Sequence, residues 1–470
     1  MKQALLVFRK DVHHLWQELG VYLLLLAAYA VAAPQVWPGK TPIGLLAVFV
    51  TLLKVLMAAS WLVLITRAVH ADSLVGDEQF WITRPYRWTS LLGGKLLFVA
   101  VCVAMPFVLM QWALILEAGL NPLSAKAALL ESIVRFALNP MLTMFVVACV
   151  TDGLASAFTF LVGIIIAWAG LLTFALSGIE MRTSPPYDRP IMSVLFGGLM
   201  IGIVIYQYAR RRTMQSRLAI GGTLVLFLLL MVGFDRAGFG APVKAMIRHH
   251  YAEISSLRLV WTESVPYEER GPDMRIPGGM VEMKLPVQIE GMASDAKLRD
   301  AHVEVEMEAG AMRYAPAWQD AVLSEHAVGF LVPKDVFRRY AAGDTKVHLE
   351  VVAEELLPAR DVKRVVADHF QGPMGGVCLL VEGKVYCRYP YEEVIPTRVE
   401  VSACGGPATS LTLRYMPVGG KFDPVVNEML PIRGNICAGD SIRFTEYGVV
   451  SEFRIALDEP SVRIDQYRVQ

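Results

Sequence analysis

The sequence has few charged residues and lacks the common motifs of nucleotide-binding and metal-dependent enzymes. Only 19% of its 470 residues are Asp, Glu, Lys or Arg, whereas 54% are hydrophobic, which is too apolar for an ordinary soluble enzyme. No Gly-x-x-x-x-Gly-Lys-Ser/Thr run is present, so the chain has no P-loop for a nucleotide phosphate. His-Glu-x-x-His and Gly-x-Ser-x-Gly are also missing. We therefore expect that the chain is not an enzyme. It should have no catalytic residue, bind no metal and hold no cofactor of its own.

The sequence also lacks a basic run interleaved with aromatic residues, which argues against nucleic acid as a partner. Its net charge of zero hides an asymmetry between the two halves of the chain. Residues 1–240 hold 18 Lys and Arg against 11 Asp and Glu, and residues 241–470 hold 26 against 33. The long apolar runs lie in the basic half, so the chain divides into a membrane half and a polar half.

The amino terminus predicts an amphipathic helix over residues 1–18 rather than a cleavable signal peptide, because the first long apolar run begins only near Leu19. Apolar residues recur at helical spacing, and charged residues fill the other face. The apolar residues are Leu5, Phe8, Val12, Leu15, Trp16 and Leu19, and the others are Arg9, Lys10, Asp11, His13 and His14. Such a helix either lies in the membrane interface or forms the first turns of the first span.

Seven apolar runs in residues 19–235 approach the length of about 20 residues that a membrane-spanning helix needs. They are residues 19–33, 43–65, 91–116, 133–150, 158–176, 191–208 and 218–234. The fourth contains Arg135 and Asn139-Pro140, so a tilted or broken helix is expected there. Lys and Arg concentrate in the connections that share a side with the amino terminus, which favours a cytoplasmic amino terminus. An odd number of spans then puts the rest of the chain outside, in a multi-pass protein of the cell (inner) membrane.

After a connector at residues 236–250, the sequence alternates apolar and polar residues, as in Val303-Glu304-Val305-Glu306. Alternation with a period of two predicts half-buried antiparallel strands. Strands are predicted at residues 281–285, 303–308, 346–352, 377–388, 397–402, 410–416, 441–457 and 462–465. Gly and Pro clusters separate them, so we expect an all-β extracytoplasmic domain over residues 251–470, built as one or two β-sandwiches with a boundary near residue 370.

Four of the six cysteines fall in this β-rich domain, and the other two fall in predicted spans. The four are Cys378, Cys387, Cys404 and Cys437, and the spans hold Cys102 and Cys149. An even number of cysteines on an oxidising side of the membrane favours disulfides. We expect the first two to be joined across a hairpin that turns at Glu382-Gly383-Lys384, which leaves the last two as the second pair. Free thiols and a zinc site are the alternatives, and no Cys-x-x-Cys spacing supports zinc.

One lysine, Lys54, lies near the centre of the second predicted span, where a charge costs roughly 2.5–3.5 kcal/mol. It either faces the helix bundle and pairs with an acid such as Glu117 or Asp152, or snorkels toward the interface from a tilted helix. The first interpretation marks an intramembrane polar site.

The connection between the second and third spans, residues 67–90, is too polar to insert into a membrane and unusually aromatic for a linker. The acidic pair Asp77-Glu78 stands near Trp81, Arg84 and Arg87. Aromatic and arginine side chains carry most of the binding energy of protein interfaces, so one interpretation is a short helix docked on another protein. The other is an aromatic belt at the level of the lipid headgroups.

The amphipathic helix, the run Gly76-Asp77-x-x-Phe80-Trp81-x-Thr83-Arg84-Pro85 and the start of the third span, Leu91-Leu-Gly-Gly-Lys95, together resemble the permease subunits of ABC-2 type exporters. The resemblance covers about the first 235 residues. In that family the inner loop is a coupling helix that contacts a separate ATPase. The resemblance implies an ATPase contact surface made of Asp72, Gly76, Asp77, Phe80, Trp81, Arg84 and Pro85. The chain departs from the usual plan of the family in its seventh predicted span and its β-rich domain.

The resemblance implies a membrane permease-like subunit of an export system, coupled through residues 67–90 to an ABC-type ATPase that binds the ATP. It also implies a homodimer or a paired permease, surrounded by membrane lipid. The residues alone support an alternative from another class, a membrane-anchored interaction or sensory protein whose outer β-domain binds an envelope partner.

Overall fold

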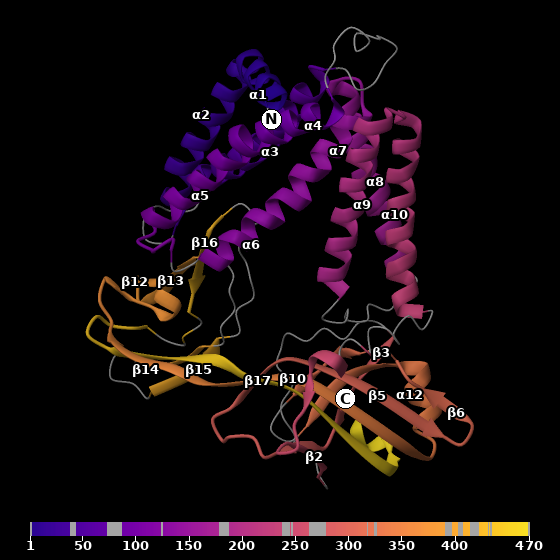
Figure 1. The fold of residues 1–470 in the computed structure, drawn as a ribbon. Helices are drawn as coiled ribbons and strands as arrows, with labels where there is room; N and C mark the ends of the chain where they lie inside the picture. Colours follow the sequence, from indigo (N-terminus) through magenta and orange to yellow (C-terminus); the bar gives the residue numbers. More distant parts are fainter. Residues whose placement is uncertain are drawn as a thin grey trace. The chain divides into compact units, whose positions relative to one another are not determined.

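The computed structural model has an amino-terminal helical region followed by a β-rich region (Figure 1), which confirms the predicted order of the two kinds of structure. It describes residues 2–37, 44–72, 87–123, 126–177, 188–236, 245, 248–262, 279–316, 318–323, 327–390, 397–402, 408–413, 423–430, 432 and 435–468. The chain forms two compact units. Unit 1 comprises residues 1–166, 195–223 and 359–446, and unit 2 comprises residues 167–194, 224–358 and 447–470.

The helical region follows the apolar runs of the sequence. Its described helices are α1 (Lys2–His14), α2 (Trp16–Ala32), α3 (Leu45–His70), α4 (Trp88–Phe98), α5 (Met105–Glu117), α6 (Lys126–Phe136), α7 (Leu142–Val150), α8 (Leu154–Ser177), α9 (Asp188–Arg210) and α10 (Thr213–Arg236). Short π-helical segments join α4 to α5 (Val99–Ala104) and α6 to α7 (Ala137–Met141).

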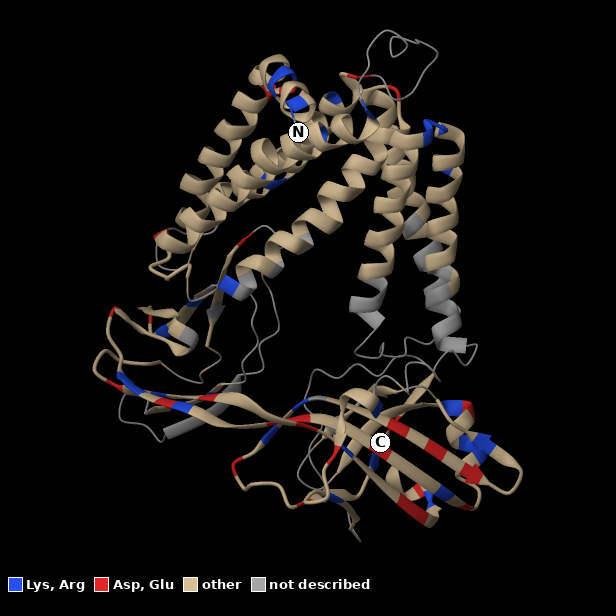
Figure 2. Ribbon diagram, viewed as in Figure 1, with Lys and Arg blue, Asp and Glu red and all other residues tan. Residues whose placement is uncertain are grey.

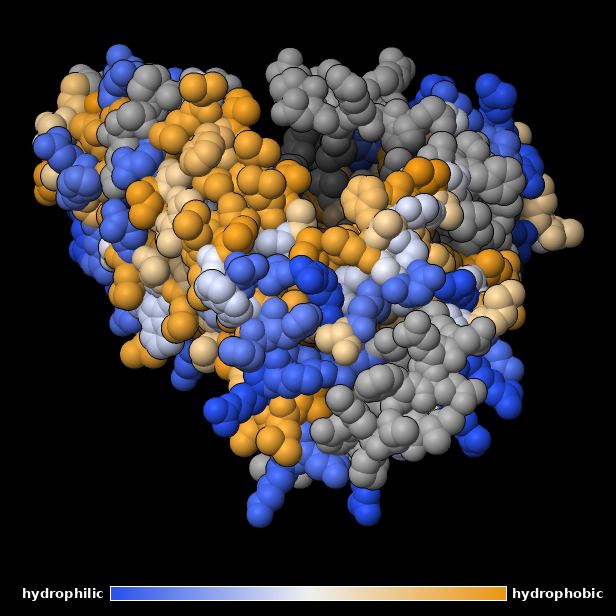
Figure 3. All heavy atoms as spheres, turned by 90° about the horizontal axis from the view of Figure 1, so that it is seen from above, coloured by the Kyte–Doolittle hydropathy of each residue, from blue (hydrophilic) through white to orange (hydrophobic). Residues whose placement is uncertain are grey.

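Four helical stretches of the described part are long and apolar enough to cross a membrane. They are Trp16–Val36, Leu45–His70, Trp88–Glu117 and Ser132–Val150, and they overlap the first four predicted spans. Charged residues are sparse along the helices and frequent on the strands (Figure 2). Hydrophobic patches lie open on the face of the molecule shown in Figure 3, and the helices contribute exposed side chains such as Leu24 and Val48. Apolar side chains that face outward from a helix are typical of a surface covered by lipid.

The fourth predicted span is irregular at the expected place. Pro140 lies inside the π-helical segment Ala137–Met141, between α6 and α7. Proline lacks the N–H that an α-helix needs, and a wider turn accommodates the lost hydrogen bond. The helix therefore continues through the proline instead of ending there.

Aromatic packing joins the spans of unit 1. The Trp61 ring lies 5.3 Å from Phe107 and 4.8 Å from Phe136, both edge to face, and the two phenylalanines stack at 4.2 Å. The Tyr22 hydroxyl donates to the Val103 carbonyl at 2.7 Å. These contacts tie α2, α3, α5 and α6 into one core, because aromatic pairs add to the energy of burial and a buried polar tip finds a backbone partner.

Unit 1 also contains part of the β-rich region. Strands β11 (His369–Gln371), β12 (Val377–Val381), β13 (Lys384–Pro390) and β16 (Val425–Met429) form one antiparallel sheet. Strand β14 (Thr397–Ser402) pairs with β15 (Ala408–Leu413) and with the first part of β17 (Ser441–Arg463).

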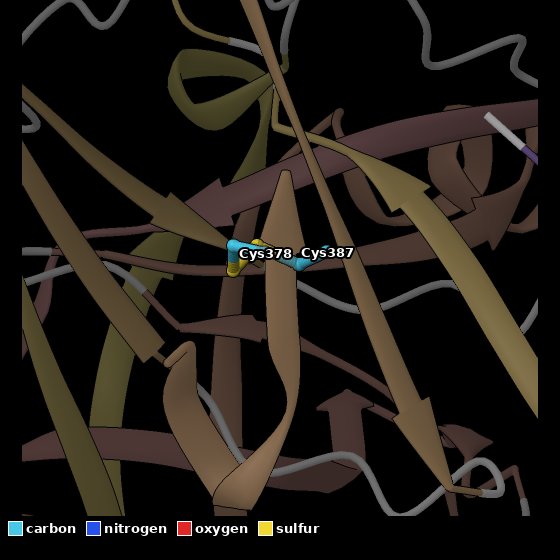
Figure 4. Close-up of a disulfide and its surroundings, with 2 residues drawn as sticks. All are labelled: Cys378 and Cys387. Carbon is cyan, nitrogen blue, oxygen red and sulfur yellow. A yellow bond between two sulfur atoms is a disulfide. The ribbon is translucent and has the colours of Figure 1, made fainter. Parts of the chain in front are cut away.

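The hairpin of β12 and β13 carries the predicted disulfide. Cys378 and Cys387 face each other across the ladder and are bonded (Figure 4). The turn residues Glu382 and Gly383 have φ of 50° and 76°, as a two-residue turn of type I′ requires. Both the pairing and the turn are thus confirmed. Cys437 is also disulfide-bonded, and Cys404, its predicted partner, lies outside the described residues.

Unit 2 is mostly β-structure. Its strands are β1 (Ala252–Glu253), β2 (Arg258–Trp261), β3 (Met280–Leu285), β4 (Val287–Glu290), β5 (Lys297–Ala309), β6 (Met312–Tyr314), β7 (Gln319–Asp320), β8 (Val322–Leu323), β9 (Val328–Pro333), most of β10 (Asp344–Val365) and the later part of β17, and its described helix between β9 and β10 is α12 (Lys334–Tyr340). Val303, Val305 and Met307 of β5 are buried, as predicted from the alternation, but Glu304 between them is buried as well, so both faces of the strand are covered at this point. The three apolar residues pack with Leu349 and Val351 of the antiparallel strand β10.

A buried carboxylate, Glu350, lies on the opposite face of β10 in unit 2. Its oxygens accept hydrogen bonds from Arg248 at 2.7 Å and from Arg454 of β17 at 2.7 Å. Burial alone would raise the pKa of Glu350, but the two arginines lower it below the ordinary value of 4.5. The ion pairs therefore join the segment before β1 to the sheet in a charge-dependent way.

This arrangement predicts acid sensitivity of unit 2. A carboxylate with a lowered folded pKa stabilises the fold above its unfolded pKa, and the contribution is lost as the pH falls through the folded value. In the full-length protein, Glu350→Gln should lower the thermal midpoint of unit 2 at pH 7. The decrease of this midpoint between about pH 5 and pH 3 should also be smaller in the variant than in wild type. Glu253→Gln is the matched control. Glu253 also contacts Arg454, but at the longer distance of 3.6 Å and with its side chain 79% exposed, so this substitution should change the thermal midpoint little. Equal pH slopes for wild type and Glu350→Gln would contradict the assignment.

Candidate functional site

Helices α1 and α4 of unit 1 approach closely because α4 contains two consecutive glycines. A Cβ added at Gly94 would lie 2.8 Å from Val7 Cβ and 2.9 Å from the Ala4 carbonyl oxygen, whereas one at Gly93 would lie 3.7 Å from Ala4 Cβ. The first distances are impossible without a shift of α1, and the last is an ordinary contact. Gly94 therefore sets the distance between the two helices.

This packing predicts different effects for two alanine substitutions. Gly94→Ala should lower the free energy of unfolding of the helical half by about 1–3 kcal/mol, because the clash involves backbone of α1. Gly93→Ala should be neutral or mildly stabilising, since alanine is the better helix former. Thermal unfolding of the purified protein in detergent measures both. Equal midpoints for the two variants would mean that α1 does not rest on Gly94.

The next residue, Lys95, is the centre of a buried charge cluster. Its Nζ lies 2.7 Å from Asp11 Oδ2 of α1 and 2.5 Å from Oδ2 of Asp72, which follows α3. The side chains of Lys95 and Asp11 are 1% and 0% exposed. Lys10 also binds Asp72 from the surface. The cluster thus joins three elements, and a buried charge that loses its partner costs several kcal/mol.

The two carboxylates of the cluster differ in their electrostatics. Burial raises the pKa of Asp11 in spite of its hydrogen bond to Lys95. Burial acts in the same direction on Asp72, but the charges of Lys95 and Lys10 outweigh it and lower the pKa of Asp72. On acidification Asp11 therefore takes up a proton before Asp72 does.

The cluster fixes the elements that flank the predicted coupling loop. Asp72 immediately precedes residues 73–86, and Arg87 and α4 follow them. Of the predicted contact surface, the structure describes Asp72, whose carboxylate faces Lys95 and Lys10. The other members, Gly76, Asp77, Phe80, Trp81, Arg84 and Pro85, lie outside the described residues. Their role as a contact surface stays a prediction.

The sequence alone does not predict a role for two residues of the cluster. Helical spacing puts Asp11 on the polar face of the amphipathic helix, and Lys95 ends the Leu91-Leu-Gly-Gly-Lys95 run. The structure buries both. The available signal was a lysine at the start of an apolar helix directly after two glycines, because a cation there needs an acidic partner that another helix brings close.

A histidine and an arginine side chain also contact the carboxyl end of α7 in unit 1. His70 Nε2 lies 2.9 Å from the Ala148 carbonyl oxygen, and Arg217 Nε donates to the Val150 carbonyl oxygen at 2.9 Å. These carbonyls have no partner within the helix, and positive charge is favourable there. The end of α3 and the start of α10 are thereby fixed to α7.

Lys54, in the candidate span Leu45–His70, lies apart from this cluster. Lys54 Nζ is 2.5 Å from Asp423 Oδ2, so its partner in the structure is Asp423 and not Glu117 or Asp152, the acids considered from the sequence. Within the described residues no group of three or more His, Cys, Asp or Glu side chains could hold a metal ion. Comparisons of the chain with protein-family models and with curated proteins find no match.

Proposed function

We propose that this chain is the membrane permease-like subunit of an ABC-2 type export system and that residues 67–90 couple it to a separate ATPase. The buried cluster of Asp11, Asp72 and Lys95 carries the proposal. A loop that receives force from a partner must be joined rigidly to the helices that it moves. Buried ion pairs give that rigidity, because separating the charges leaves each of them in an apolar environment.

In this proposal the cluster makes α1, α3 and α4 move together as one rigid body. Displacing the loop at Asp72 would pull on Lys95 and Asp11 together, and Gly94 holds α1 against α4. The spans that follow the cluster would then move with the loop. In this proposal the ATP belongs to the partner subunit, and the permease works as a homodimer or with a second permease.

The proposed topology has seven spans. Helices α8, α9 and α10, with 24, 23 and 24 residues, would add three spans to the four apolar stretches. An amino terminus in the cytoplasm is supported by three basic residues, Arg210 at the end of α9 and Arg211 and Arg212 between α9 and α10. An extracytoplasmic position of the β-rich region is supported by the Cys378–Cys387 disulfide. The proposal also takes this region to be built from β-sandwiches and the protein to lie in the cell (inner) membrane.

Affinity purification of the full-length protein in mild detergent tests the coupling role. A nucleotide-hydrolysing subunit should co-purify with wild type, and Trp81→Ala with Arg84→Ala should reduce its retention by about tenfold or more, since such residues are typical hot spots. Trp112→Ala with Arg398→Ala is the matched control, because both side chains are exposed and lie outside the loop. Normal retention by the Trp81 and Arg84 variant would sink the proposal.

The alternative is a membrane-anchored interaction or sensory protein, in which the helices would serve only to hold the chain in the membrane. A passive anchor has no use for buried charges within its helical half, and these cost stability unless they are paired. The structure has such charges in Asp11 and Lys95. The anchor hypothesis also requires that activity survive replacement of the helices by an unrelated membrane anchor.

A further inference from the structure

Helix α1 of unit 1 contains one acidic residue, and the structure buries it. Asp11 is 0% exposed and pairs with Lys95 of α4. Val7, one turn before Asp11, and Leu15, one turn after it, are buried as well. None of the exposed residues of α1, which is described over its whole length, is acidic. The charge on the exposed side of α1 is therefore positive.

Two leucines and two cations share this exposed side. Leu5 and Leu6 are 59% and 60% exposed, and Lys2 and Arg9 are exposed as well. Residues three or four positions apart are neighbours on a helix surface, so both leucines lie between Lys2 and Arg9. We call these four residues the outward face of α1. It combines apolar side chains with positive charge.

The acids near this face are already paired, so they do not cancel its charge. Each of three acids at this end of unit 1 contacts a cation. The acids are Asp11, Glu18 and Asp72, and the cations are Lys10, Arg67 and Lys95. The three acids and the three cations balance one another. Lys2 and Arg9 therefore add a net positive charge to this part of the surface.

The candidate spans place the outward face near a membrane surface. Helix α1 directly precedes the candidate span Trp16–Val36, and it packs on α4, which begins the candidate span Trp88–Glu117. Trp16, at the junction of α1 and α2, is 64% exposed, and tryptophan is enriched at the boundary between membrane and water. With these helices across a bilayer, α1 lies at the level of the lipid headgroups.

We propose that the outward face of α1 binds anionic phospholipid. The two leucines insert between the headgroups, and the two cations donate charge-assisted hydrogen bonds to lipid phosphates. A zwitterionic lipid is a weaker ligand, because its own cationic group opposes Lys2 and Arg9. The Asp11–Lys95 pair fixes the inward side of α1 to α4, so the outward face is held in place and little conformational entropy is lost on binding. The site does not depend on coupling to an ATPase.

The preference of the full-length protein for phosphatidylglycerol over phosphatidylcholine tests the proposal. Native mass spectrometry in dodecyl maltoside, with each lipid titrated separately, measures the two affinities. Wild type should bind phosphatidylglycerol about tenfold more tightly or more, since each Lys or Arg near an anionic surface contributes about fivefold. Lys2→Gln with Arg9→Gln should lose most of this preference.

Lys363→Gln with Lys384→Gln is the matched control for charge. Both lysines are exposed and lie on strands of the same unit, so this variant removes the same charge and should keep the wild-type preference. Equal affinity of wild type for the two lipids would overturn the proposal. An unchanged preference in the Lys2 and Arg9 variant would overturn it as well.

A second measurement reports on α1 directly. Full-length Leu6→Cys is placed in lipid nanodiscs, and its reaction with an uncharged, water-soluble maleimide is followed. The cysteine should react about fivefold more slowly or more in phosphatidylglycerol than in phosphatidylcholine nanodiscs, because the anionic lipid draws this face into the headgroups. Lys363→Cys should react at similar rates in both. Equal rates for Leu6→Cys would overturn the proposal, and slow reaction in both lipids would mean that protein covers this face instead.

Discussion

Replacing Lys95 by methionine should lower the free energy of unfolding of the helical half by about 3–5 kcal/mol, the range measured when one partner of a buried ion pair is removed. Methionine fills a similar volume, so the loss would come from charge and not from a cavity. Asp11 and Asp72 would remain facing each other without the ammonium group that now lies within 2.7 Å of both. Thermal or denaturant unfolding in detergent measures the effect.

Lys10→Met is the control for the Lys95 substitution. Lys10 binds the same Asp72 but is 40% exposed, and exposed ion pairs contribute only about 0–1 kcal/mol. Adding Asp11→Asn to Lys95→Met should restore part of the lost stability, because it removes one of the two orphaned charges. If Lys95→Met unfolds at the wild-type midpoint, the cluster does not hold α1, α3 and α4 together. The coupling proposal would then lose its physical support.

Loss of the Cys378–Cys387 bridge should have the second largest effect. The double substitution to alanine should destabilise the β12–β13 hairpin and the sheet around it by about 2–4 kcal/mol, because the bridge restricts the unfolded chain. Both sulfur atoms are buried among Val385, Tyr389 and Val399, so the alanines also leave unfilled space. The thermal midpoint and protease resistance of the β-rich region report the change.

A reductant provides the control for the disulfide. Reduction should lower the midpoint of wild type more than that of the Cys378→Ala/Cys387→Ala variant, which no longer has this bridge to lose. Cys149→Ala should keep the wild-type response, since Cys149 is a free buried cysteine of α7. An identical response of wild type and the double variant would show that the bridge contributes nothing to stability.

The features that followed from the sequence depend on neighbouring residues. Apolar runs predicted the four apolar stretches, alternation predicted strands such as β14, and Cys378 and Cys387 flank a Glu-Gly turn that fixes their register. Each signal needs only the local period of the chain or a two-residue turn. Pro140 likewise predicted an irregular helix, since the missing N–H is a property of the residue itself.

The sequence by itself determined the division into an apolar helical half and an alternating β half, the course of single helices and strands, and one disulfide. Only the tertiary structure decided which charges meet. Lys95 reaches Asp11, 84 residues away, and Lys54 reaches Asp423, 369 residues away. The reason is physical: hydrophobicity and backbone preference act over one or two turns, whereas the partner of a buried charge is chosen by packing, which brings together residues that no local pattern relates.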